Sequence, residues 1–373
     1  MVKSSYRYVL ELLRGDGSSA GRAVAHVDWD AAEESARFAA LRCGGPVRSA
    51  WRDDSSAEPI WHPTLGTPFV SGLRVTVRGE GGDSVSTDVS TAYFGGCAQD
   101  AVSQLVARGT LASGERVVFL TTAFLSDEPP RLQAPAVFDA VDAAPHLPLP
   151  GASMADVERD AVLTGAAEAD DVPVFVPQTV LDEAARLARE AGSSETGGVL
   201  VGNVHRDSGG TDLFVRVSAQ LAARHTEASA TRLTFTSETW TDMRAALALR
   251  RREEVMVGWW HSHPVRHWCK DCPVERQRVC GLVRNFFSDH DRALHRAVFS
   301  AAYCVALVVN DGAGEPTFSL FGWRRGLIEL RAFGVTGASG RAEAGASQRV
   351  QTECDPCSQR EPTFPTSVPS PIG

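Results

Sequence analysis

The sequence has no long apolar run and no concentration of basic residues. No stretch approaches the ~18 uninterrupted apolar residues of a membrane-spanning helix, and residues 1–7 lack the apolar core of a signal peptide. The 37 Lys and Arg residues are dispersed among 46 Asp and Glu residues, which gives a net charge of −9. We therefore expect a soluble, cytoplasmic protein with neither a nucleic-acid nor a membrane partner.

Common nucleotide-binding patterns are also missing. Gly95-Gly96-Cys97 precedes a predicted helix, but neither a Walker lysine nor a dinucleotide-binding pattern surrounds it. Without a secretory signal, the clustered spacing of the eight cysteines favours metal or redox chemistry over a disulfide framework. The cysteines are Cys43, Cys97, Cys269, Cys272, Cys280, Cys304, Cys354 and Cys357.

The length of 373 residues predicts two domains and a tail. Residues 1–165 are typical of a separate α/β domain, which could bind a partner, be a degenerate copy of the second domain or form a dimerisation unit. Residues 143–172, with Pro145, Pro148 and Pro150 and an acidic stretch, are predicted to form a polar linker. Residues 336–373 have few large apolar side chains and are predicted to be disordered.

Hydrophobic periodicity predicts the elements of both halves. In the first half we expect a strand or short helix at 6–13, helices at 31–42 and 98–108, an exposed strand at 73–78 and a strand at 115–122. In the second half we expect helices at 178–191, 237–251 and 288–300, and strands at 174–177, 199–204, 213–219, 232–235, 255–260, 303–310, 317–323 and 328–333.

The clearest candidate for chemistry is His261-Ser262-His263-Pro264, at the end of a predicted buried strand. Alternate side chains of a strand share a face, so the two imidazoles point the same way and can share a metal ion. The preceding Trp259 and Trp260 face opposite sides. At most one of them can pack against the metal face, and core packing is the expected role of both.

A catalytic zinc commonly takes three protein ligands. Asp291, three residues after Ser288, is the best third ligand, and Glu195 is the best general base. Each feature also has a simpler explanation. The H-x-H motif could be two partly buried histidines, Ser288 and Asp291 could form the capping box of a helix, and Glu195 could be an exposed loop carboxylate.

Taken in chain order, Glu195, the H-x-H-P motif, and Ser288 with Asp291 resemble the pattern of the JAMM (MPN-plus) zinc metalloproteases of the bacterial deubiquitinase-like type. That pattern is a distant Glu, then H-x-H-P, then S-x-x-D, and residues 195–202 match the family's E-T-x-G-x-L-x-G. The resemblance covers residues 172–335. It implies an α/β (α+β) fold with a mixed, cytidine-deaminase-like sheet flanked by helices. It also implies a catalytic zinc held by His261, His263 and Asp291, with Glu195 as general base and Ser288 as a donor to the oxyanion.

One departure from the family is the long segment between Pro264 and Ser288. At the family's usual spacing the chain offers Cys272 and Glu275 instead. We prefer an insertion over residues 265–287, because the helix predicted after Ser288 leads into an apolar strand, as the family's S-x-x-D does. Glu275 is the alternative third ligand.

The insertion contains Cys269, Cys272 and Cys280, a spacing typical of a structural zinc site. His267, Cys354 or Cys357 could supply the fourth ligand. The alternatives are an iron–sulfur cluster, a loop with free thiols and a C-x-x-C disulfide.

The resemblance implies hydrolysis of a peptide or isopeptide bond after the C-terminus of a ubiquitin-like protein. The expected setting is a bacterial ubiquitin-like conjugation pathway of antiphage defence. Expected partners are the ubiquitin-like protein, its conjugates and the activating and conjugating (E1-like and E2-like) enzymes. The alternatives are processing of a sulfur-carrier protein and a non-catalytic MPN scaffold. A zinc deaminase would require H-x-E and P-C-x-x-C, which the sequence does not match.

Overall fold

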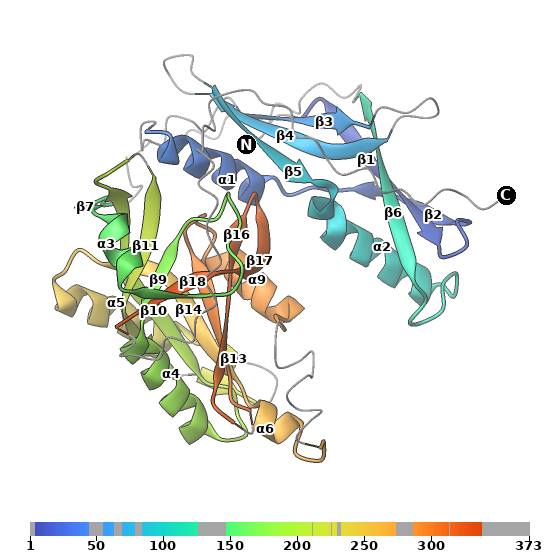
Figure 1. Cartoon of the computed structure of the whole chain (residues 1–373). Helices are drawn as coiled ribbons and strands as arrows, with labels where there is room; N and C mark the ends of the chain where they lie inside the picture. Colours follow the sequence, from blue (N-terminus) through green and yellow to red (C-terminus); the bar gives the residue numbers. More distant parts are fainter. Residues whose placement is uncertain are drawn as a thin grey trace. The chain divides into compact units, whose positions relative to one another are not determined.

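The computed structural model describes ten stretches of the chain, which form two large sheets, a short hairpin and the helices around them (Figure 1). The described residues are 4–44, 55–62, 69–78, 84–125, 147–210, 212–224, 226–229, 233–273, 286–312 and 314–337. The tail predicted to be disordered falls almost entirely outside these ranges, so that prediction stays open.

The first sheet has six strands in the order β2-β1-β6-β4-β3, with β5 also paired to β4. The strand predicted at 73–78 is present, but it is not an exposed strand, because β4 pairs with neighbours on both sides and Leu73, Val75 and Val77 are buried. The elements are β1 (Tyr6–Arg14), β2 (Ser19–Ala25), α1 (Asp30–Arg42), β3 (Ser55–Trp61), β4 (Val70–Arg78), β5 (Ser84–Ser90), the 3-10 helix η2 (Thr91–Phe94), α2 (Gly95–Ala107) and β6 (Val117–Leu125).

The second sheet has the order β17-β16-β15-β14-β10-β11-β9-β18-β8, with β7 paired to β10. Its strands are β7 (Gly151–Ala152), β8 (Ala161–Thr164), β9 (Val174–Pro177), β10 (Gly197–Asp207), β11 (Leu213–Ala222), β14 (Val255–His263), β15 (Val305–Asn310), β16 (Thr317–Arg324), β17 (Leu327–Arg331) and β18 (Phe333–Thr336). The β14–β15 and β9–β11 pairs are parallel and β10–β14 is antiparallel, so the sheet is mixed.

Helices cover both faces of this second sheet. The apolar side of α4 (Gln178–Ala191) joins one core cluster, and α5 (Ser237–Arg250) packs in another. The remaining elements are α3 (Met154–Arg159), the hairpin β12 (Thr226–Ala228) and β13 (Leu233–Phe235), α6 (Val265–Trp268) and α9 (Asp289–Val298). The predicted α+β fold class, with a mixed sheet flanked by helices, is confirmed.

Two segments differ from the elements predicted for them. The single strand predicted at 328–333 is interrupted at Ala332; β17 continues a hairpin with β16, whereas β18 pairs with β8 and β9. The segment predicted as a polar linker contains β7, α3 and β8, and both strands join the second sheet. The division into separately folding domains stays a prediction.

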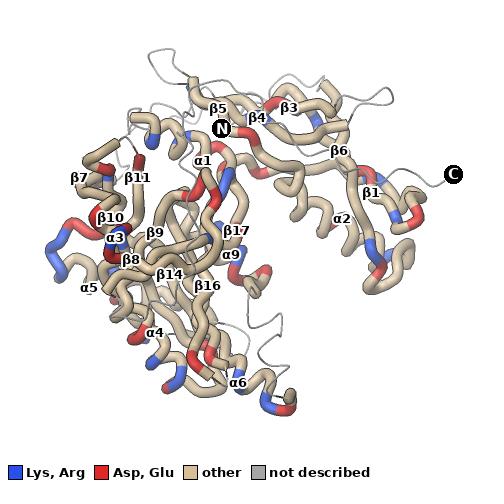
Figure 2. Tube along the Cα trace, viewed as in Figure 1, with Lys and Arg blue, Asp and Glu red and all other residues tan. Residues whose placement is uncertain are grey.

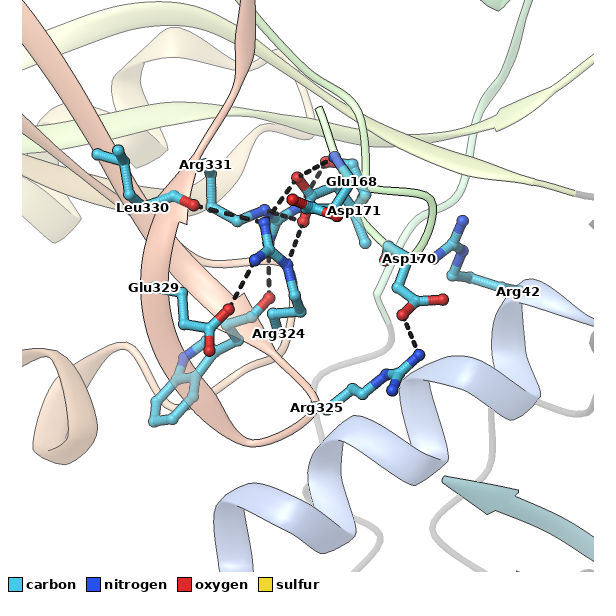
Figure 3. A network of polar contacts seen from close by, with 11 residues as sticks. Arg42, Glu168, Asp170, Asp171, Arg324, Arg325, Glu329, Leu330 and Arg331 are labelled. Atoms are coloured by element: carbon cyan, nitrogen blue, oxygen red, sulfur yellow. Dashed lines mark hydrogen bonds and ion pairs between the residues drawn. The ribbon is translucent and has the colours of Figure 1, made fainter. Parts of the chain in front are cut away.

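Within the acidic stretch that ends that segment, Asp171 is buried, whereas Glu168 and Asp170 are exposed. Asp171 is 8% exposed and accepts a hydrogen bond from Arg324 Nε at 2.8 Å. Arg331 Nε lies 2.6 Å from the same carboxylate, and its guanidinium also donates to the carbonyl oxygen of Val172. Figure 3 shows how this network ties residues 168–172 to β16 and β17.

Helix α1 contributes to the cores of both sheets. Ala32, Ala36 and Ala40, spaced four residues apart, pack with the first sheet. Phe38 and Leu41 belong to the core cluster of the second sheet. The described residues accordingly belong to one compact unit.

Basic and acidic positions are interspersed along the drawn trace (Figure 2). No helix within the described stretches is long and apolar enough to cross a membrane.

Candidate metal centre

The two histidines of the H-x-H motif lie on β14, near the middle of the second sheet. Their side chains are almost fully buried, and the two Nε2 atoms are 3.1 Å apart. Asp291 Oδ1 lies 3.5 Å from His261 Nε2. One ligand atom from each of His261, His263 and Asp291 lies within 4.8 Å of the others, which is the one such potential metal-binding group among the described residues.

Glycines let three strands approach closely at this point. A Cβ added to Gly197 of β10 would overlap the carbonyl oxygen of Trp260. A Cβ added to Gly258 of β14 would overlap the carbonyl oxygen of Val305 on β15. Gly197, at a variable position of the matched sequence pattern, therefore lets the segment that carries Glu195 lie close to the strand that carries the histidines.

Asp291 reaches the histidines from the first turn of α9. Ser288 is the N-cap of this helix: its Oγ accepts from the Asp291 backbone N–H, and Asp291 Oδ2 accepts from the Ser288 backbone N–H at 2.8 Å. The capping box expected as the simpler explanation is therefore present. The capping box uses Oδ2 of Asp291, so Oδ1 of Asp291 is the oxygen that faces His261.

The protonation states of the cluster suit a metal ion. Burial lowers the pKa of His263 to about 3, and the neighbouring His261 acts in the same direction. Burial acts to raise the pKa of Asp291, but His261 and the hydrogen bonds from Ser288 hold it below its ordinary range. A neutral imidazole and an ionised carboxylate are the forms that coordinate a divalent cation.

Glu195 is buried beside this cluster, not exposed in a loop. Its pKa is raised to about 7, first by burial and then by the charge of Asp291, with His261 opposing the shift. Its backbone N–H donates to the carbonyl oxygen of Ser229 at 2.8 Å. The next N–H along the chain, that of Thr196, donates to Ser262 Oγ at 3.0 Å. Ser262, between the two histidines, therefore holds the chain beside Glu195.

Aromatic side chains surround the two imidazoles. Trp259 stacks on His261 with ring centroids 4.7 Å apart, whereas Trp260 packs in the cluster on the opposite face, as strand alternation predicts. Trp268 and Phe286, near the two ends of the insertion, contact the ring of His263. Trp259 therefore packs in the core, as expected, and also against the ring of His261.

One buried residue near the cluster, His295, was not among the predicted site residues. Its Nδ1 accepts a hydrogen bond from Trp259 Nε1 at 3.1 Å. Its position four residues after Asp291 places both side chains on one face of α9, and this spacing is the signal that could have identified it.

The predicted structural zinc site is only partly within the described residues. Cys269 is buried and Cys272 is exposed, in a turn closed by a hydrogen bond from the Cys272 N–H to the Cys269 carbonyl oxygen. Cys280 lies outside the described residues, as do Cys354, Cys357 and the alternative ligand Glu275. Cys269, Cys272 and His267 belong to no metal-binding group in the described stretches, so this site stays a prediction.

Comparison with known proteins identifies one domain. Residues 177–267 match the family model described as prokaryotic homologs of the JAB domain. No curated protein matches the chain. Among solved structures, the solution structure of protein DSY2949 from Desulfitobacterium hafniense is 18% identical, with a TM-score of 0.30, and the match covers 42% of this chain and 89% of that one. The family match spans Glu195, His261 and His263, and the chain therefore contains a JAB domain of the prokaryotic JAB/MPN type.

Proposed function

We propose that this chain is a zinc-dependent peptidase or isopeptidase that cleaves after the C-terminus of a ubiquitin-like protein. It would release that protein from conjugates, or process its precursor, in a bacterial ubiquitin-like conjugation pathway of antiphage defence. The observation that carries the proposal is the buried His261, His263 and Asp291 cluster with Glu195 beside it. A non-catalytic scaffold would have no need of this set.

The chemistry of the three side chains fits zinc. Two neutral imidazoles and one carboxylate are a usual ligand set for a catalytic site, with one position left open. Zinc bound there would lower the pKa of a water molecule and polarise the scissile carbonyl group. Ser288 supports the site by fixing the Asp291 carboxylate, whose remaining oxygen is directed at His261.

Glu195 is suited to be the general base and acid. A pKa of about 7 allows a carboxyl group to take up a proton and release it again near neutral pH. The carboxylate would accept the proton of the attacking water and deliver it to the leaving amine. The hydrogen bonds at the Glu195 and Thr196 N–H groups fix the backbone from which this side chain projects.

Ser288 is also proposed to donate to the oxyanion that forms during hydrolysis. Its hydroxyl lies 2.7 Å from Asp291 Oδ2. The hydroxyl would therefore have to exchange this hydrogen bond for one to the oxyanion. Loss of such a donor typically lowers the rate by ~10²–10³.

The proposed substrate is the extended tail of a ubiquitin-like protein that ends in glycines. Trp268 and Phe286 contact the ring of His263, and bulky rings beside the site favour a tail of small residues. Such a tail would bind by strand addition beside the site. Proposed partners are the conjugates and the E1-like and E2-like enzymes of the same pathway. A sulfur-carrier protein with a similar tail is the alternative substrate.

The direct test is cleavage of ubiquitin-like proteins fused through their C-terminal glycines to a reporter, in parallel with a sulfur-carrier fusion. Zinc-loaded wild type should cleave at the junction, and Glu195→Gln should keep its zinc and lose turnover. Glu190→Gln, at an exposed helix position paired with Arg186, is the matched control and should remain active. Absence of cleavage by zinc-loaded wild type across the fusions would contradict the proposal and favour the scaffold.

A further inference from the structure

We infer that Trp259 and His295 are positioning residues that hold the ring of His261 in place at the metal centre. This inference rests on the proposed zinc site and gives a role to a buried histidine that the proposed mechanism does not use. It concerns the support of the ligand, and neither residue is proposed to touch the substrate.

Apart from Trp259, the His261 ring contacts Phe287, tilted at 6.2 Å between centroids, and the edge of His263, and neither contact is a stack. Its Nε2 faces His263 and Asp291, so Nδ1 is the nitrogen left for a supporting hydrogen bond. In most metal sites that nitrogen donates to a carboxylate or a carbonyl group, which fixes the ring. Among the described residues His261 Nδ1 has no hydrogen-bond partner. The orientation of the ring must therefore come from packing.

The packing that meets this need is the stack on Trp259. The two rings are 4.7 Å apart between centroids, at an interplanar angle of 15°. Both side chains are at most 1% exposed. A rotation of the His261 ring out of the stack would lose this contact in a densely packed interior.

The indole of Trp259 is in turn fixed by His295. Its Nε1–H donates to His295 Nδ1 at 3.1 Å. Burial lowers the pKa of His295 to about 3, so this nitrogen is unprotonated and can accept. Because His295 follows Asp291 by one helical turn, α9 supplies one metal ligand and also holds the side chain that supports another.

Trp260 provides a matched control within the same strand. It is fully buried, and its Nε1–H donates to Gln220 Oε1 at 3.0 Å. Substitution of either tryptophan by phenylalanine therefore removes a buried indole and one hydrogen bond. Of the two tryptophans only Trp259 stacks on a proposed ligand, so the two substitutions differ in whether they remove a contact with the His261 ring.

The experiment measures the zinc affinity of the full chain by competition with a chromogenic chelator, for wild type, Trp259→Phe, His295→Phe and Trp260→Phe. Trp259→Phe and His295→Phe should weaken zinc binding about tenfold, in the range seen when support of a metal ligand is lost. Trp260→Phe should bind as wild type does. A cooperative thermal unfolding transition of each metal-free variant is the control that the variant is folded.

A second readout separates positioning from general packing. Cobalt(II) bound in place of zinc has visible absorption bands that report the geometry of its ligands, and thiolate ligands add intense near-ultraviolet bands. The visible bands should shift in Trp259→Phe and stay unchanged in Trp260→Phe. Equal affinities and spectra in Trp259→Phe and wild type would overturn the inference. Wild type that binds neither metal through the histidines would overturn the proposed metal centre itself.

Discussion

Ser262 lies between the two histidines in the sequence, yet its side chain serves the neighbouring segment. At the end of the β10–β14 ladder the Thr196 N–H donates to Ser262 Oγ, while the Ser262 N–H donates to the Thr196 carbonyl oxygen. The Ser262 hydroxyl thus accepts a hydrogen bond next to the last backbone hydrogen bond of this strand pair. It couples the strand that carries the ligands to the residue that follows Glu195.

We expect Ser262→Ala to lower kcat about threefold to tenfold, the equivalent of one lost hydrogen bond, with the zinc content unchanged. Hydrogen exchange of the Thr196 amide should become faster, and this readout does not depend on activity. Ser262→Thr retains a hydroxyl and is the control. Unchanged exchange at Thr196 in Ser262→Ala would show that the hydroxyl does not hold this segment.

The buried carboxyl group of Glu195 makes the stability of the metal-free chain depend on pH. Its pKa is about 7 in the folded chain and near its ordinary 4.5 in the unfolded chain. Between these values the folded state binds more protons, so its stability falls as the pH rises from about 4.5 to about 7. Glu195→Gln should be more stable than wild type at about pH 8, by about 1–3 kcal/mol, and similar at about pH 4. Urea unfolding at both pH values measures the difference; an equal difference at both would contradict the shift.

Part of this site can be predicted from residue patterns. The period of a strand places His261 and His263 on one face, and the capping box of Ser288 and Asp291 is a local pattern. The approach of Asp291 to the histidines was expected from the need for a third ligand and from the family resemblance, because no local pattern links the two segments. The contacts of Ser262 and His295 depend on pairings over 36 residues or more, which no local pattern encodes.

Hydrophobic periodicity predicted the helices and strands better than local composition did. The helix predicted at 178–191 has the same bounds as α4, because its apolar positions repeat on one face. The prolines and acidic residues of 143–172 predicted a linker, and this was wrong for residues 151–164. The strands of this segment pair with strands that follow far along the chain, β7 with β10 and β8 with β18, and no local pattern encodes these pairings.

We expect Asp171→Asn to lower the free energy of unfolding by about 3–5 kcal/mol, because it leaves the buried guanidinium of Arg331 without its carboxylate. Asp170→Asn is the control. Asp170 pairs with Arg325, and both side chains are about half exposed, so the loss should stay within about 1 kcal/mol. Chemical denaturation of the two variants gives the comparison. Similar losses would show that the Asp171 network contributes no more than a surface pair.

For the whole molecule, α1 is the element that links the two sheets. Its place in the sequence and its amphipathic pattern predicted a helix of the first half alone. The structure adds contacts with the second half: Phe38 packs with Tyr303, and Arg42 donates to both carboxylate oxygens of Asp212. Sequence patterns identify the apolar face of a helix, but they do not tell which of two cores will bury it.

Phe38→Ala should therefore destabilise the second sheet as well as α1. We expect a loss of about 3–5 kcal/mol, as for a phenylalanine removed from a packed core. Phe124→Ala is the control, because the side chain of Phe124 on β6 is 51% exposed. Hydrogen exchange should show reduced protection in β9 and β15 for Phe38→Ala. Protection lost only within residues 6–125 would contradict the shared role of α1.

The most direct test of the central claim is the metal content of the purified full chain, measured by inductively coupled plasma mass spectrometry. Wild type is compared with the double variant His261→Ala/His263→Ala and with His62→Ala as a control. The double variant should contain one zinc fewer per chain than wild type, and His62→Ala should lose none. An equal zinc content in wild type and the double variant would contradict a metal centre at these histidines.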